Sequence, residues 1–471
     1  RIPAFLINIH RISSQSDAQA YIARLRGIEP LFEQLAVLLD ERARLGIVPP
    51  KFVFPYVIQD CRNILTGEPF DDSGEDSTLL ADFRAKVLAL DIPAADRQAL
   101  VAEAERALVD HVGPAYRGLL AELQALAKLG TDDDGVWKHP DGERFYAYAL
   151  RNITTTDLTA AEIHALGLAE VDRIHAEMRD IMAQVGFDGD LADFFVHLRE
   201  DPRYYYPDTD EGRQAYLARV DEILAAMTAK LGTAFDTLPN AELVAKRVES
   251  FREKSAGKAF YSRSAPDGSR PGVYYANLYD MRDMPRYEAE ALVYHEGLPG
   301  HHMQIAIAGE LEDIPRFRRI GGYTAFIEGW GLYSEFLGKE MGFYQDPYSD
   351  FGRLAMELWR ACRLVVDTGI HQLGWTREEA IDYLLANTSA SRGQSRKAIE
   401  RYIVMPAQAT AYKIGMLRIL AVRQQAHSEL GDRFELRRFH DTILRSGALP
   451  LPILENVVAD WVAAEQAAGP P

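Results

Sequence analysis

The stretch from Tyr294 to Gln304 constrains the fold of this chain more than any other part of it. It reads Tyr-His-Glu-Gly-Leu-Pro-Gly-His-His-Met-Gln and holds three of the twelve histidines. A neutral imidazole is a favoured zinc ligand, and a carboxylate beside a zinc-bound water is a ready general base. His-Glu followed closely by His is typical of metallopeptidases with the motif His-Glu-x-x-His, but the spacing here is different.

That spacing predicts a break in the helix. His295 and His301 are six positions apart, which on a regular helix means a rise of roughly 9 Å and a rotation of about 240°. Two ligand atoms so placed cannot both lie about 2 Å from one zinc ion. His302 faces the right way but lies about 10.5 Å along the axis. A metal shared by these residues therefore requires the helix to be interrupted.

The residues between the histidines suit such an interruption. Pro299 lacks an N–H group and clashes with the preceding turn, while Gly297 and Gly300 tolerate unusual backbone angles. We predict that Gly-Leu-Pro-Gly forms a bulge that brings His301 back beside His295. The alternative is a helix–loop–helix with histidines at the surface.

A third ligand is expected from another segment. Residues 321–335 read Gly-Gly-Tyr-Thr-Ala-Phe-Ile-Glu-Gly-Trp-Gly-Leu-Tyr-Ser-Glu and predict a second buried helix. Apolar residues surround Glu328, and a buried carboxylate is costly unless it is paired or binds a metal. We therefore predict Glu328 as a ligand. Glu335 shares its face and is either a partner of a ligating histidine or a salt-bridged glutamate.

These segments resemble a bacterial family called domain of unknown function 885. The resemblance runs over most of the chain, and the strings that carry it are long and specific. They are His-Glu-Gly-Leu-Pro-Gly-His-His-Met-Gln (295–304), Phe-Ile-Glu-Gly-Trp-Gly-Leu-Tyr-Ser-Glu (326–335), Val-Val-Asp-Thr-Gly-Ile-His (365–371), Pro-Ala-Gln-Ala-Thr-Ala-Tyr-Lys-Ile-Gly (406–415) and Leu-Thr-Ala-Ala-Glu-Ile-His-Ala-Leu-Gly-Leu (158–168). That family is in turn similar to the helical zinc peptidases of the carboxypeptidase Taq and thimet oligopeptidase type.

The resemblance implies roles for the residues of both motifs. The helical zinc peptidases use His-Glu-x-x-His and a glutamate from a later helix, within a Phe-x-Glu-Asn-Trp-like string. It therefore implies that His295, His301 and Glu328 bind Zn²⁺ and that Glu296 is the general base. This chain departs from the pattern by two extra residues between the histidines, which leaves both His301 and His302 open as the second ligand.

Amide hydrolysis on zinc also needs a donor for the oxyanion of the tetrahedral intermediate. Tyr412, Tyr402 and His371 are the candidates. The resemblance favours a tyrosine from a late helix and hence Tyr412, although a purely structural role for each is the alternative.

Charged residues on a predicted late helix offer a possible anchor for substrate. Arg360, Arg363 and Asp367 lie at i, i+3 and i+7 and share one face, as an ion-pair cluster would. One arginine could instead bind the C-terminal carboxylate of a substrate bidentately. Arg392, Arg396 and Lys413 are further candidates for that role.

Composition excludes several classes of function. The formal net charge is −18, from 70 acidic and 52 basic residues, which argues against nucleic acid or an anionic membrane as a partner. No stretch of about 18 uninterrupted apolar residues predicts a transmembrane helix. The two cysteines, Cys61 and Cys362, indicate neither a disulfide framework nor a cysteine zinc site. The compartment and the oligomeric state are left open.

Helical periodicity dominates the chain and predicts an all-α fold. Residues 16–46 and 396–430 are each predicted as one long helix, and 94–130 as helix interrupted at Gly113-Pro114. Thr159 and Glu162 form a capping box that opens a helix to about Val185. Residues 260–277 predict a β-hairpin ahead of the metal helix, with a turn at 265–271.

The fold expected from these features is a large helical metallopeptidase-like domain with a small hairpin or sheet and a deep cleft. We expect a single catalytic domain over residues 1–471, preceded by an N-terminal segment because the chain begins Arg-Ile-Pro without an initiator methionine. The predicted function is zinc-dependent hydrolysis of short peptides, of the carboxypeptidase or oligopeptidase kind. The alternatives are a zinc hydrolase of a non-peptide amide or ester and a non-catalytic protein that binds metal or peptide.

Overall fold

A computed structural model of the chain describes residues 2–249, 252–253, 256–265 and 268–468. Contacts divide it into two compact units, Arg1–Asp133 with Lys138–Pro140, and Asp134–Trp137 with Asp141–Pro471. The sequence analysis predicted one domain over residues 1–471. It gave no sign of the division because the same helical periodicity runs through both units.

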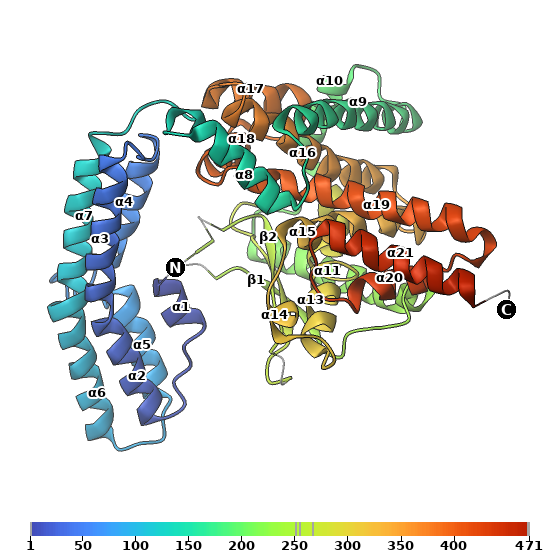
Figure 1. Ribbon diagram of the computed structural model, residues 1–471. Helices are drawn as coiled ribbons and strands as arrows, with labels where there is room; N and C mark the ends of the chain where they lie inside the picture. Colours follow the sequence, from blue (N-terminus) through green and yellow to red (C-terminus); the bar gives the residue numbers. More distant parts are fainter. Residues whose placement is uncertain (1, 250–251, 254–255, 266–267, 469–471) are drawn as a thin grey trace. The chain divides into compact units, whose positions relative to one another are not determined.

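The regular elements among the described residues of the first unit are helices (Figure 1), apart from an isolated β-bridge between Glu68 and Asp76. Its helices are α1 (Ile2–Asn8), α2 (Gln15–Arg26), α3 (Ile28–Arg44), α4 (Val53–Ile64), α5 (Thr78–Leu88), α6 (Ala94–Ala107) and α7 (Gly113–Ala127). Apolar side chains of α2, α5 and α6, among them Tyr21, Phe83 and Leu100, form its core.

Two interruptions in this unit follow from proline. The single helix predicted for 16–46 is wrong, because α2 ends at Arg26 and α3 begins at Ile28. Pro30 cannot donate a hydrogen bond to the carbonyl of Arg26, and its ring clashes with that group. The predicted interruption near Gly113-Pro114 is confirmed, since a π-helical turn, Leu108–Val112, lies between α6 and α7.

The second unit contains the remaining helices and a small sheet. Its helices are α8 (Gly142–Thr154), α9 (Ala160–Gln184), α10 (Leu191–Glu200), α11 (Asp210–Lys230), α12 (Ala289–Glu296), α13 (His301–Glu310), α14 (Arg316–Ile320), α15 (Thr324–Glu340), α16 (Pro347–His371), α17 (Arg377–Asn387), α18 (Arg392–Val404), α19 (Ala411–Leu430), α20 (Leu436–Leu444) and α21 (Leu451–Ala467). The capping box of Thr159 and Glu162 at the start of α9 is confirmed.

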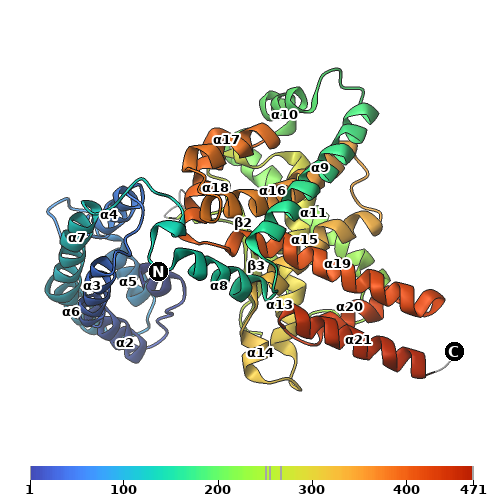
Figure 2. The ribbon, with the colours of Figure 1, turned by 45° about the horizontal axis from the view of Figure 1, so that its top comes forward.

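Helix α16 forms the centre of this unit. All but two of its residues from Ser349 to His371 are buried. Helix α9 lies along it, while α15 lies along α19 (Figures 1 and 2). The single helix predicted for 396–430 is wrong, because α18 ends at Val404 and α19 begins at Ala411. Pro406 disfavours helix in the residue before it, and Ala407 follows with φ = 69°.

The sheet has three strands, β1 (Leu243–Arg247), β2 (Ala259–Ser262) and β3 (Gly272–Ala276), in the order β1-β3-β2. Strands β2 and β3 are antiparallel, with Phe260 opposite Tyr275, which confirms the predicted hairpin. Part of its predicted turn, residues 266–267, lies outside the described residues. The parallel strand β1 was not predicted. Since β3 is central, β2 is an edge strand.

The fold is therefore mainly helical with a small sheet, as predicted. The enclosed peptidase-like cleft remains a prediction. Among the described helices, none combines the length and the apolar composition that a membrane span requires.

Candidate metal centre

The helix breaks between the histidines, as predicted. Helix α12 ends at Glu296, and α13 begins at His301 after a turn over 297–300. A Cβ atom at Gly300 would lie 2.0 Å from the carbonyl oxygen of His295 and 2.3 Å from that of Tyr294. Only glycine fits this close approach of two backbone segments, which folds the chain back and returns His301 to the side of His295.

Three potential ligand atoms converge at this break. His295, His301 and Glu328 each offer one atom, and these atoms all lie within 4.8 Å of one another. Glu328 Oε2 lies 3.3 Å from His301 Nε2 and 3.6 Å from His295 Nε2. Both histidines are buried, whereas the side chain of Glu328 keeps 19% of its exposure. The predicted ligand residues are thus brought together from α12, α13 and α15.

The residues fit a zinc ion by geometry and by donor type. Two atoms that each lie 2.0–2.1 Å from a tetrahedral zinc are about 3.3 Å apart, close to the two separations above. Two imidazole nitrogens and one glutamate oxygen form the three-ligand set of one class of catalytic zinc sites. His295 Nε2 and His301 Nε2 would hold the ion together with Glu328 Oε2.

The second shell of the cluster is built around His295. Its Nδ1–H donates to Glu335 Oε1 at 2.7 Å, which fixes the tautomer and leaves Nε2 toward Glu328. Glu335 therefore bonds a predicted ligand, which agrees with one of its two predicted roles, and Arg360 Nη2 lies 3.7 Å from its Oε1. At Gly331 a Cβ atom would lie 2.8 Å from the imidazole of His295, so this glycine makes room for the ring against α15.

The charges of the cluster influence one another. Burial lowers the pKa of His295, but hydrogen bonds with Glu328 and Glu335 outweigh it and raise the pKa to about 9. Burial raises the pKa of Glu328, but the imidazoles of His295 and His301 outweigh it and hold that pKa well below its ordinary value. The site therefore favours a carboxylate with positive charge beside it, the role that a metal cation can take.

His301, and not His302, lies with the cluster. His302 Nε2–H donates to the carbonyl oxygen of Ala241 at 3.0 Å, and its Nδ1 accepts from the hydroxyl of Tyr261 at 3.1 Å. Burial lowers the pKa of His302 to about 4, which keeps the ring neutral. His301 Nδ1 is buried and has no hydrogen-bond partner among the described residues, so His301 lacks the support that Glu335 gives to His295.

Glu296 lies beside the cluster and contacts the sheet. It is the last residue of α12, and its Oε2 accepts a hydrogen bond from the backbone N–H of Tyr261 at 3.0 Å. Tyr261 belongs to the edge strand β2. The carboxylate is thus oriented through one of its oxygens.

Tyr412 is brought to the cluster by the close approach of two helices. Its ring is buried and lies nearly parallel to that of His295, with 6.3 Å between centroids. A Cβ atom at Gly415 of α19 would lie 1.9 Å from the carbonyl oxygen of Ala325 of α15. This glycine lets α19 contact α15, the helix that bears Glu328, and so places the first turn of α19 near the predicted ligands.

The other two candidate donors do not join the cluster. His371 Nδ1 accepts from the N–H of Val136 at 3.2 Å, and its Nε2–H donates to the carbonyl of Tyr402 at 3.1 Å. Burial lowers its pKa to about 4. The prediction of His371 as a catalytic residue is corrected, because backbone groups occupy both ring nitrogens. The hydroxyl of Tyr402 accepts from Arg363 Nε at 2.9 Å.

The predicted ion-pair face of α16 does not form. Arg360 pairs with Glu335, while Asp367 Oδ1 accepts hydrogen bonds from the hydroxyl of Tyr146 at 2.6 Å and from the N–H of Ala407 at 3.0 Å. The three residues share a helical face, as predicted, but each meets a different neighbour. Spacing along one helix does not reveal these neighbours, because they come from other elements.

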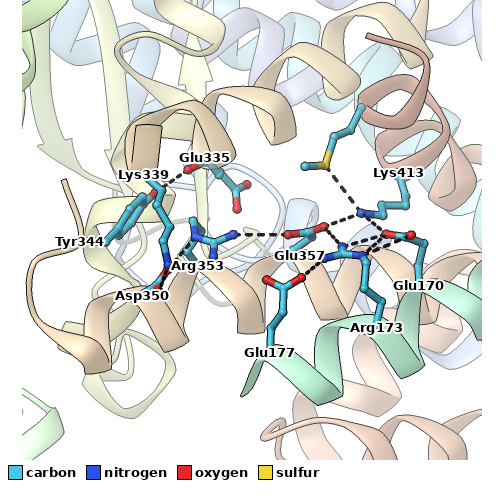
Figure 3. Close-up of polar contacts among 11 residues, drawn as sticks. Glu170, Arg173, Glu177, Glu335, Lys339, Tyr344, Asp350, Arg353, Glu357 and Lys413 are labelled. Carbon is cyan, nitrogen blue, oxygen red and sulfur yellow. Dashed lines mark hydrogen bonds and ion pairs between the residues drawn. The ribbon is translucent and has the colours of Figure 1, made fainter. Parts of the chain in front are cut away.

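A buried network of ion pairs connects helices of this unit and was not predicted (Figure 3). Lys413 Nζ, fully buried, meets Glu357 Oε1 and lies 2.8 Å from Glu170 Oε2. The network also includes Arg173, which meets both glutamates, Arg353, Asp350, Lys339 and Glu177. Lys413 is therefore not available as a carboxylate anchor. A lysine within the otherwise apolar start of α19 was the signal in the sequence.

Comparisons with known proteins extend over nearly the whole chain. A family described as a bacterial protein of unknown function, DUF885, matches residues 1–458. The crystal structure of a candidate lipoprotein from Colwellia psychrerythraea is similar, with a TM-score of 0.94 and 35% identity, and the match covers 98% of this chain and 79% of that one. No curated protein matches.

A second solved structure is that of a candidate lipoprotein of unknown function from Shewanella oneidensis. Its TM-score is 0.71 at 18% identity, over 97% of this chain and 81% of that one. At this identity the likeness shows the fold alone. Because the family match spans almost all of the sequence, the chain belongs to the bacterial family of proteins of unknown function, DUF885.

Proposed function

We propose that this protein is a zinc-dependent hydrolase that cleaves peptide bonds in short peptides. The observation that carries the proposal is the convergence of His295, His301 and Glu328 beside a carboxylate, Glu296, that is not itself part of the ligand set. A site that only binds metal has no need for such a neighbour, whereas a hydrolytic site requires a base.

The residues supply the proton transfers that hydrolysis needs. Zinc in a site of this kind polarises a carbonyl group and makes a water molecule acidic near neutral pH. Glu296 accepts the proton from the attacking water and then donates it to the nitrogen of the leaving amine. The N–H of Tyr261, at 3.0 Å from Glu296 Oε2, holds the base in place for both steps.

Tyr412 is the proposed donor to the oxyanion. Its ring lies 6.3 Å from that of His295, and within the part of the chain that the structure describes its hydroxyl has no hydrogen-bond partner. A donor that is free in the resting protein can bond to the oxygen on which negative charge develops, and such donors typically contribute a factor of about 10²–10³ to the rate.

The edge strand β2 favours a peptide over other amides. Tyr261 places this strand next to Glu296, and β3 pairs with only one of its edges. An extended peptide can add to the other edge through backbone hydrogen bonds. We propose that a narrow approach to the site limits substrates to short, unfolded peptides.

The test combines metal analysis with one conservative substitution. The protein purified without chelator is expected to hold about one zinc per chain, and Glu328→Ala to lose it. Glu296→Gln is expected to keep the zinc and to lose 10²–10⁴-fold of the peptidase activity, as is typical of a general base. Glu312→Gln, a change at an exposed glutamate, is the matched control and should have wild-type activity.

The substrate panel contains peptides and acyl esters of matched sequence. Cleavage of the peptides that disappears in Glu296→Gln supports the proposal. Cleavage of the esters alone would instead favour a hydrolase of another class. Full zinc occupancy in Glu328→Ala, or wild-type peptidase rates in Glu296→Gln, would refute the assignment of these residues.

A further inference from the structure

Arg363 carries a buried charge that meets no carboxylate at ion-pair distance among the described residues, although the charge of Glu328 acts on it from farther away. The residue is 8% exposed, and its Nη1 has no hydrogen-bond partner among the described residues. Its Nε donates to the hydroxyl of Tyr402 at 2.9 Å, which is a neutral acceptor. Within the described ranges no carboxylate lies at ion-pair distance from it. Burial of an unpaired charge costs several kcal/mol, so such groups normally have a partner.

The other buried arginines of α16 follow that rule. Arg353 pairs with Asp350 at 2.8 Å and with Glu357 at 3.5 Å (Figure 3). Arg360 lies 3.7 Å from Glu335. Three arginines on one helix thus share a buried environment, and Arg363 alone among them faces tyrosines in place of a carboxylate.

Arg363 lies next to the proposed active site. Its guanidinium carbon is 4.3 Å from the centre of the Tyr412 ring, and that ring is 6.3 Å from the ring of His295. The guanidinium is therefore within about 11 Å of the His295 ring, the sum of the two separations. The ring of Tyr412, the proposed oxyanion donor, is thus a neighbour of both Arg363 and His295.

We propose that Arg363 binds the C-terminal carboxylate of the substrate, so that the enzyme releases residues from the C-terminal end of peptides. This inference rests on the proposed function and specifies its substrate class. A planar guanidinium binds a carboxylate through two parallel hydrogen bonds. The carboxylate of the substrate would supply the partner that Arg363 lacks at ion-pair distance. Binding of the substrate would therefore also neutralise the buried charge.

The distance limits how many residues can leave. One residue spans at most about 3.3–3.6 Å, and a charge-assisted N–H···O bond adds about 2.8 Å. A carboxylate on Arg363 therefore leaves room for at most about two residues between it and the peptide bond beside the predicted ligands. Water adds across that bond, the acyl carbon keeps the hydroxyl, and the amine of the released amino acid or dipeptide takes the proton.

The experiment compares acids with amides in two proteins. The substrates are N-acetylated tripeptides with a free C-terminus and the same peptides as C-terminal amides. Wild-type enzyme is expected to cleave the acids on the order of 10²-fold faster in kcat/KM, the range for loss of a buried charge partner. In Arg363→Met this preference should disappear, so that acids and amides are cleaved at similar rates.

Binding provides a second readout that needs no turnover. In the Glu296→Gln background, calorimetry should show that the acids bind more tightly than the amides and that Arg363→Met removes the difference. Arg363→Lys keeps the positive charge but loses the planar guanidinium, and it should retain part of the preference for acids. Arg423→Met is the matched control, because Arg423 also lies over a tyrosine ring, that of Tyr333, but pairs with Glu340 at 2.7 Å.

The outcomes separate this inference from the proposed function. Cleavage of acids and amides at equal rates would overturn the carboxylate site and leave the peptidase intact. An acid preference that survives in Arg363→Met would also overturn it. Tighter binding of acids, lost in Arg363→Met, with no hydrolysis of either series by the wild-type protein would support the carboxylate site and refute the peptidase.

Discussion

The metal centre and the ion-pair network of Lys413 both bury charge in the second unit, but they balance it differently. In the network every carboxylate meets a cation, as Glu357 meets Lys413 and Arg173. In the metal centre two imidazole nitrogens and a carboxylate oxygen converge, and Glu335 adds a second carboxylate behind His295. A network in which each carboxylate is paired with a cation stabilises the fold, whereas a set of converging electron-pair donors can bind a cation from outside.

The pKa shifts reflect this difference. Burial raises the pKa of Glu357, but Lys413 and Arg173 outweigh it and hold the pKa at about 2. The carboxylate therefore stays charged because lysine and arginine are fixed beside it. In the metal centre only histidines perform that role, and histidine must be neutral to bind a metal. Substitutions in the two regions are thus expected to affect different quantities, metal affinity in one and stability in the other.

The largest effect is expected from the adjacent histidines. His301→Ala removes a ligand nitrogen and should weaken zinc binding by more than about 10³-fold, well beyond the 10–100-fold typical of outer-shell changes. His302→Ala removes a ring that bonds Ala241 and Tyr261 and should keep the metal with reduced activity. Zinc titration of both variants measures the contrast. Loss of zinc in His302→Ala alone would place the ligand one residue later.

A second prediction concerns the bulge that joins the two histidines. Gly300→Ala would put a methyl group 2.0 Å from the carbonyl oxygen of His295, so the turn must open and separate His295 from His301. We expect zinc affinity to fall by about 10²-fold, because the ligands remain but are misplaced. Gly309→Ala, where nothing lies within 4 Å of the added atom, is the control. Wild-type affinity in Gly300→Ala would show that the turn tolerates a side chain.

The sequence predicted the local parts of this site well. The spacing of His295 and His301 required a broken helix because helical geometry is fixed, and the bulge at Gly297–Gly300 is confirmed. Glu328 could be assigned because a carboxylate among apolar residues needs a partner. The capping box at Thr159 and the pairing of β2 with β3 were also predicted, since each depends on residues close in sequence.

Contacts between segments that lie far apart in the sequence could not be predicted from it. Strand β1 pairs with β3 across more than 20 residues, and its sequence, Leu-Val-Ala-Lys-Arg, has no turn that links it to its partner. His371 was misassigned because the groups that occupy it, from Val136 and Tyr402, lie far away in sequence. The network of Lys413 was missed for the same reason, since its partners come from α9 and α16.

The third prediction tests whether the ion-pair network of Lys413 stabilises the folded protein. Lys413→Met leaves Glu357 and Glu170 without their buried lysine, and loss of one partner of a buried ion pair costs about 3–5 kcal/mol. Chemical denaturation should show this loss, while zinc content stays at the wild-type value. Lys339→Met is the matched control, because Lys339 binds Asp350 at the exposed end of the network and should cost less than about 1 kcal/mol. A Lys413→Met variant with wild-type stability but without zinc would contradict this prediction, because it would show that the network supports metal binding and not stability.

The smallest effect is expected at Asp367, which belongs to neither region. It is fully buried and has hydrogen bonds from Tyr146 and Ala407 but no cation beside it among the described residues. Burial raises its pKa to about 7, although these hydrogen bonds oppose the shift. Since its unfolded pKa is about 3.9, the folded state keeps the proton between about pH 4 and 7 while the unfolded state loses it. Stability therefore falls as the pH rises through that window.

Asp367→Asn cannot ionise and retains an oxygen that accepts both hydrogen bonds. We expect it to match the wild type near pH 4 and to be more stable by about 1–3 kcal/mol between pH 5 and 6, because each pKa unit corresponds to about 1.4 kcal/mol. Denaturant unfolding at several pH values gives the difference, with Asp313→Asn, at an exposed carboxylate, as the control. A difference that does not change with pH would mean that Asp367 is ionised in the folded protein. A cationic group would then have to balance its charge, as Lys413 and Arg173 do for Glu357. Both carboxylates would then be charged and paired.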